Sequence, residues 1–118
     1  MRNEKGKFLA IMRIELQDLH EDIEDLIQQT TRERESGALT NYVFLENLAL
    51  FRNELLGVNT FGRLLDKVAP AEFGTLDELV EHLKASFRSR IKAAGLAEAI
   101  DLYLERKVDK ARRYVEHV

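Results

Sequence analysis

The chain has 118 residues, of which 45% are hydrophobic and 33% charged, with a formal net charge of −3. This length and composition predict a single all-helical domain of residues 1–118 and exclude a wholly disordered chain. The absence of cysteine excludes a disulfide framework, a thiolate zinc site and a cysteine nucleophile. No apolar run approaches the ~20 residues of a membrane span, and no signal-peptide pattern is present. We therefore expect no membrane partner and a cytoplasmic location.

The composition favours helices, because leucine, glutamate, alanine, arginine and lysine dominate it and each of these residues has a high helix propensity. No window alternates apolar and polar residues with a period of two, so strands are not expected. We predict an all-α fold, a helical bundle of four long helices plus one short helix, opened by a long N-terminal antiparallel helical hairpin.

The clearest predicted element is an N-terminal helix of about 30 residues that ends at Ser36-Gly37, where glycine accepts the left-handed backbone found just past helix ends. Its apolar residues recur at alternating intervals of three and four, which is typical of a stripe that faces another helix. The stripe consists of Leu9, Met12, Leu16, Leu19, Ile23 and Leu26. A helix of about 45 Å is longer than a compact chain of this size, so part of it should project or meet a second copy. We predict a homodimer that self-associates through this stripe.

A second helix is predicted from a cap at Thr40 or Asn41 to the neighbourhood of Gly57. Its stripe comprises Phe44, Leu48, Phe51, Leu55 and Val58. The link to the first helix is so short that an antiparallel hairpin with facing stripes is expected. Three further apolar residues lie off this stripe, and we expect them to meet other helices: Leu45, Ala49 and Leu56.

A short helix is predicted after a cap at Asn59 or Thr60, with Phe61, Leu64, Leu65 and Val68 as its apolar residues. It ends at Ala69-Pro70, because proline disfavours helix in the residue before it. The segment Thr75-Leu76-Asp77-Glu78 is a capping box that opens the next helix, which ends near Ala94-Gly95. The last helix follows after a very short turn, so these two helices should be antiparallel or sharply bent, and a continuous helix through Gly95 is the alternative. Their apolar stripes are Leu76, Val80, Leu83, Phe87 and Ile91, and Leu96, Ile100, Leu104, Val108, Ala111, Val115 and Val118.

Charge is distributed unevenly, because residues 14–31 contain no lysine or arginine whereas residues 84–113 carry an excess of them. The last helix has a basic stripe that we single out as a candidate partner- or anion-binding site: Arg106, Lys110, Arg113 and His117. An acidic row runs beside it: Glu98, Asp101, Glu105 and Asp109. Two interpretations stay open, namely ion pairs between helices and contact with an anionic partner.

The acidic face of the first helix raises the question of a metal site. Asp18, Asp22 and Asp25 share one helix face, and His20 and Glu24 share another. Ferritin-like carboxylate proteins use a Glu-x-x-His pair on each of two helices, and this sequence has no such pair. The carboxylates also lie off the apolar stripe. We therefore predict a solvated acidic face or docking strip, with no metal and no cofactor.

The segment Arg112-Arg113-Tyr114-Val115-Glu116-His117, an arginine followed by four residues and a histidine, resembles the signature of HEPN ribonucleases. The resemblance implies an all-helical, often dimeric protein in which Arg112 and His117 act on an RNA phosphodiester. It covers six residues, and Arg113 stands where the family often has asparagine or another small polar residue. This gives an alternative function, a nucleic-acid-binding or HEPN-like nuclease module that uses the C-terminal basic stripe.

No other catalytic pattern is present, since the chain has neither GxGxxG nor GxxxxGK[ST] and no serine with a histidine and an acid in a recognisable arrangement. We predict no catalytic residues. The favoured function is a non-enzymatic protein-interaction or regulatory module whose partner is a second copy of itself or another protein.

Overall fold

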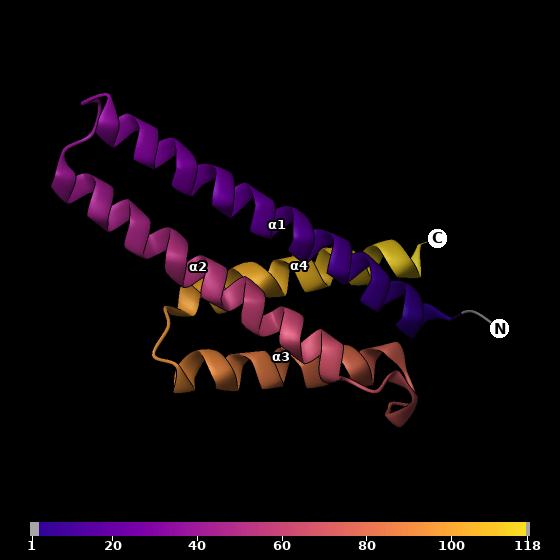
Figure 1. The fold of residues 1–118 in the computed structure, drawn as a ribbon. Helices are drawn as coiled ribbons and strands as arrows, with labels where there is room; N and C mark the ends of the chain where they lie inside the picture. Colours follow the sequence, from indigo (N-terminus) through magenta and orange to yellow (C-terminus); the bar gives the residue numbers. More distant parts are fainter. Residues whose placement is uncertain (1–2, 118) are drawn as a thin grey trace.

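Four α-helices account for most of the protein in this computed structural model, which describes residues 3–117. They are α1 (Glu4–Glu35), α2 (Asn41–Lys67), α3 (Leu76–Ala93) and α4 (Glu98–Glu116), with a short 3₁₀ turn, η1 (Pro70–Glu72), between α2 and α3. No strand occurs in the described residues. The predicted all-α bundle with a long N-terminal hairpin is confirmed, and Figure 1 shows α1 and α2 running antiparallel along most of the molecule.

The turn of the hairpin forms as its sequence predicts. Gly37 has a φ of +81°, so α1 ends where a left-handed residue is available. The Thr40 hydroxyl accepts a hydrogen bond from the Val43 N–H at 3.2 Å and caps α2. The exposed end of the hairpin is held by Phe44, which is buried between the two helices with the Arg34 guanidinium 4.1 Å above its ring.

The predicted boundary near Gly57 is wrong, because α2 continues through this glycine to Lys67. Phe61 and Leu65 extend the buried face of Val58 without a change of period, so the predicted short helix after Asn59 or Thr60 is the last part of α2. Pro70 then starts η1. The Lys5 ammonium of α1 donates hydrogen bonds to the Pro70 and Phe73 carbonyls and fixes this connector.

The capping box at the start of α3 forms with one difference. The Thr75 hydroxyl accepts the Glu78 N–H at 3.1 Å, but the Glu78 carboxylate accepts the N–H of Gly74, at 2.9 Å, rather than that of Thr75. Gly95, with a φ of +69°, reverses the chain, and α4 returns antiparallel to α3 (Figure 1). The predicted stripes of both helices are buried from Leu76 to Ile91 and from Ile100 to Val115, whereas Leu96 is half-buried and Val118 lies outside the described residues.

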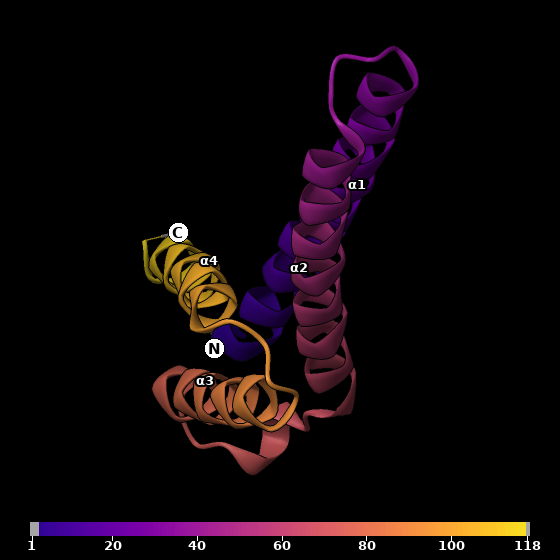
Figure 2. The same ribbon diagram turned by 90° about the vertical axis from the view of Figure 1, so that its left-hand side faces the viewer.

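The core lies at one end of the hairpin, where all four helices meet. Phe61 of α2 and Phe87 of α3 contact edge to face at a centroid distance of 5.0 Å, and Phe8 of α1 is completely buried beside them in the same cluster. The other end of the hairpin extends beyond α3 and α4, as Figure 2 shows. The radius of gyration, 16.6 Å, exceeds the ~13–14 Å of a compact chain of this length, so the hairpin projects.

Candidate interaction surface

The apolar stripe of α1 is part of the chain's own core. Its first five members, from Leu9 to Ile23, are at most 6% exposed because α2 and the other helices cover them. Leu26 is the exception, with 41% of its surface exposed. A second copy can therefore reach Leu26, but contact with the rest of the predicted self-association stripe would require the folded chain to open.

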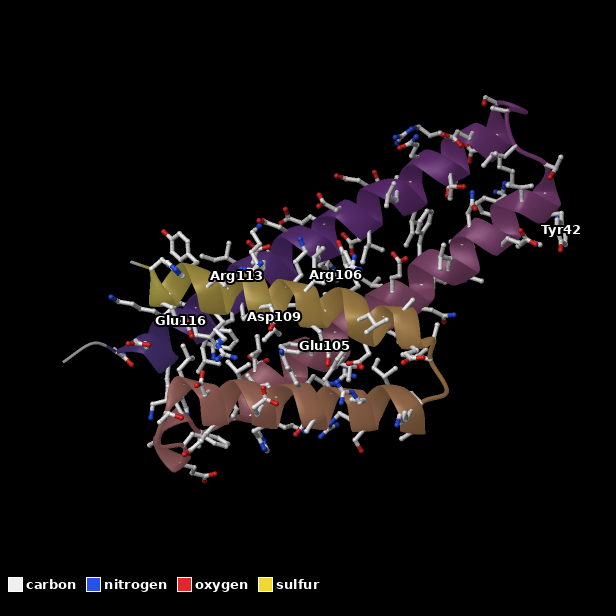
Figure 3. All side chains as sticks on the ribbon, turned by 180° about the vertical axis from the view of Figure 1, so that it is seen from behind. Tyr42, Glu105, Arg106, Asp109, Arg113 and Glu116 are labelled. Carbon is white, nitrogen blue, oxygen red and sulfur yellow. The ribbon has the colours of Figure 1, made fainter. Side chains whose placement is uncertain are left out.

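The basic side of α4 faces α1 and is partly neutralised there. The ammonium groups of Lys107 and Lys110 lie 3.9 and 3.5 Å from the two carboxylate oxygens of Glu15. Arg106 and Arg113 are exposed and form no ion pair within residues 3–117. Figure 3 shows both arginines on the edge of α4 that points away from α3.

The acidic side of α4 faces α3 and pairs with its basic residues. Arg88 reaches both Asp101, whose carboxylate oxygen lies 3.2 Å from its Nε, and Glu105. Lys84 lies 2.7 Å from Asp109. The hydrogen bonds to Asp101 and Glu105 raise the pKa of Arg88. Three members of the acidic row, Asp101, Glu105 and Asp109, thus pair with α3, whereas Lys110 is the one member of the predicted basic stripe that pairs with another helix among residues 3–117.

The two residues of the HEPN-like motif are engaged separately. Arg112 lies 2.6 Å from Asp77 and 3.0 Å from Glu116, and the hydrogen bond to Glu116 raises its pKa. The His117 Nδ1 lies 2.7 Å from the Arg113 carbonyl at the end of α4. Within the described residues, no hydrogen bond or ion pair joins the two side chains.

The acidic face of α1 is solvated. The His20 Nε2 lies 2.9 Å from Glu24 and its Nδ1 lies 3.2 Å from Asn59, so both ring nitrogens have partners within the protein. No three carboxylates or histidines of residues 3–117 converge as a metal ion would require.

The apolar residues that lie off the α2 stripe form the most unusual surface. Tyr42, Leu45 and Leu56 are 71%, 51% and 52% exposed, and Ala49 is exposed between them. Their spacing of three, four and seven residues places them on one side of the helix. The prediction that Leu45, Ala49 and Leu56 meet further helices is wrong, because all three side chains are exposed. We call these four residues the α2 outer stripe.

A small apolar cavity lies on a different side of α2, where α4 begins. Its volume is about 120 Å³, and Ile23, Leu50, Ile100 and Tyr103 line it. Burial raises the pKa of Glu54 at its rim. Cavities that bind metabolites are typically 300 Å³ or larger, so this one is a packing gap.

A wider depression of about 720 Å³ lies between α2 and α3 and is open to solvent. Its lining includes His82, Ser86 and Ser89, and no hydrogen bond joins these side chains among the residues that the structure describes.

Comparison with known proteins identifies no relative of this chain. Neither a family, nor a curated protein, nor a solved structure matches this chain. No helix within residues 3–117 is both long enough and apolar enough to span a membrane.

Proposed function

We propose that this protein is a non-enzymatic interaction module that associates with a second copy of itself. The observation that supports this proposal is the composition of α2 around its whole circumference. One side packs on α1, another packs on α3 and α4, and the remaining side carries the α2 outer stripe. Exposed charged residues such as Glu46 and Arg52 flank this stripe, and an apolar stripe with a polar rim is typical of an interaction surface.

The contrast with α1 strengthens this argument. The outward-facing residues of α1 between positions 14 and 31 are mainly carboxylates and amides, as expected of a helix that faces water. The α2 outer stripe instead exposes an aromatic and two leucine side chains, which are residues that interfaces use as anchors or bury at their centre. The stripe begins at Tyr42, at the end of the hairpin that extends beyond α3 and α4 (Figure 2).

Sedimentation equilibrium at micromolar to hundred-micromolar concentration tests the proposal. We expect a species of twice 13.6 kDa whose fraction rises with concentration. The variant L45E/L56E should be a monomer, because it introduces two carboxylates into the apolar contact. The matched control L102E changes a leucine of similar exposure, 49%, on α4 and should associate like the wild type. A wild-type monomer throughout this range, or association that L45E/L56E leaves intact, would contradict the proposal.

A further inference from the structure

We infer that the second copy packs α2 against α2 in an antiparallel arrangement, with a two-fold axis at Ala49. This inference rests on the proposed self-association and specifies its geometry. Ala49 lies in the middle of the α2 outer stripe, seven residues from both Tyr42 and Leu56. Packed helices lie 8–10 Å apart, and a small residue at the crossing point allows the shorter distances in that range.

Two of the apolar residues of the stripe, Tyr42 and Leu56, match each other in this register, whereas Leu45 lies level with the amide side chain of Asn53. When two antiparallel helices cross at Ala49, residues equally far before and after it lie level with each other. Tyr42 of one copy then lies level with Leu56 of the other, and the same pair forms again on the other side of the axis. The most exposed aromatic residue of the chain, 71% exposed, therefore receives an aliphatic partner twice.

The charges along the stripe favour the same register. Glu46 and Arg52 lie three residues before and after Ala49, and both are exposed. Neither forms an ion pair with another residue of the described chain. Antiparallel packing at Ala49 places Glu46 of one copy level with Arg52 of the other. Parallel packing in register would instead place Glu46 level with Glu46 and Arg52 level with Arg52, which like-charge repulsion opposes.

Cysteine cross-linking tests this register cleanly, because the chain has no cysteine of its own. A disulfide requires Cα atoms within about 7 Å, a distance that only level residues on facing helices reach. The variant A49C should form a disulfide dimer with itself under mild oxidation. The variants Y42C and L56C should not do so alone, because their own copies lie about 21 Å apart along the helix axis. An equimolar mixture of Y42C and L56C should give the mixed disulfide. The control A10C places an exposed thiol on α1 and measures random collision.

Charge reversal gives a second, independent readout in the cysteine-free chain. The single variants E46R and R52E should each weaken the dimer about 10-fold, because each makes level residues alike in charge. The double variant E46R/R52E exchanges the two charges and should return the dissociation constant to within about 2-fold of the wild-type value.

The outcomes separate this inference from the proposed function. Self-disulfides of both Y42C and L56C would show parallel packing and overturn the antiparallel register while leaving self-association intact. A dimer in sedimentation with A49C no more reactive than A10C would show that another surface is used, and would also overturn it. A wild-type chain that remains monomeric at hundred-micromolar concentration would overturn both.

Discussion

Gly57 of α2 lies so close to Ile100 of α4 that a Cβ atom at position 57 would overlap the Ile100 Cγ2 methyl group. Both residues are buried, and Ile91 of α3 lies at the edge of the same contact. Isoleucine in a helix has one strongly preferred χ1 rotamer, so a rotation that moves this methyl group aside is costly. The glycine therefore sets how closely α2 and α4 approach each other.

The first prediction compares two glycines of α2. G57A should lower the free energy of unfolding by about 1–3 kcal/mol, because the added methyl group overpacks the contact with Ile100. G62A should raise it by about 0.5–1 kcal/mol, because position 62 has open space and alanine favours helix. Urea unfolding followed by circular dichroism measures both. A G57A variant as stable as G62A would contradict the close approach of the two helices.

The same glycine shows where the sequence was ambiguous. Helical periodicity is a local property, so the apolar stripes and the end of α1 at Gly37 were predictable from the sequence. A glycine that ends a helix and a glycine that admits another helix look alike in one sequence. From the sequence, Gly57 is equally consistent with the end of a helix, and the position of Ile100, 43 residues later in the chain, reveals its role. The apolar repeat from Val58 to Leu65 was the signal that α2 continues.

The second prediction concerns the heptad stripe of α1. L16A should cost about 2–4 kcal/mol of folding free energy, because Leu16 is 6% exposed and its loss leaves a cavity. L26A should cost less than about 1 kcal/mol, because Leu26 is 41% exposed. Chemical denaturation of the wild type and both variants, at a concentration where the wild type is monomeric, measures the two losses of folding free energy. Equal losses of folding free energy in L16A and L26A would mean that Leu16 and Leu26 do not differ in burial.

The third prediction follows from the raised pKa of Glu54. Burial favours the protonated carboxyl group, so its contribution to stability is present below the ordinary pKa of 4.5 and is lost as the pH rises through the higher folded-state value. At neutral pH the charged side chain is a net cost. E54Q should therefore melt about 1–3 °C above the wild type near pH 7, and this difference should vanish below pH 4.5.

Thermal scans monitored by circular dichroism at the two pH values provide this measurement. The control E81Q changes an exposed glutamate of α3 and should shift neither melting temperature relative to the wild type. An E54Q variant that melts below the wild type near pH 7 would mean that the Glu54 carboxylate is stabilised by its surroundings rather than penalised by burial.

The α2 outer stripe illustrates a second limit of the sequence. Leu45, Ala49 and Leu56 were visible as apolar residues outside the hairpin contact, and they were expected to be covered. Which side of a hairpin is covered depends on where later helices pack, and the turn at Pro70 and the close approach at Gly57 carry α3 and α4 to another side. These are contacts between distant parts of the chain, and no local pattern encodes them.

The fourth prediction concerns the pair between α3 and α4. Asp101 is 4% exposed, one of its carboxylate oxygens contacts Arg88, and the other has no hydrogen-bond partner in the described part of the chain. R88A should lower the melting temperature markedly, because it leaves a buried carboxylate without a cation. E105A should lower it less, because Arg88 then still pairs with Asp101.

The double variant R88A/D101A distinguishes a loss of charge pairing from a loss of side-chain packing. Removal of both charges should recover much of the melting temperature that R88A loses, since the cost lies in the unpaired buried carboxylate rather than in the missing arginine. R106A serves as the control, because Arg106 is an exposed arginine of α4 without an ion-pair partner among residues 3–117. If R88A/D101A melts no higher than R88A, the unpaired Asp101 carboxylate is not the cause of the lower melting temperature. The ion pair between Arg88 and Asp101 then contributes little to the packing of α4 against α3.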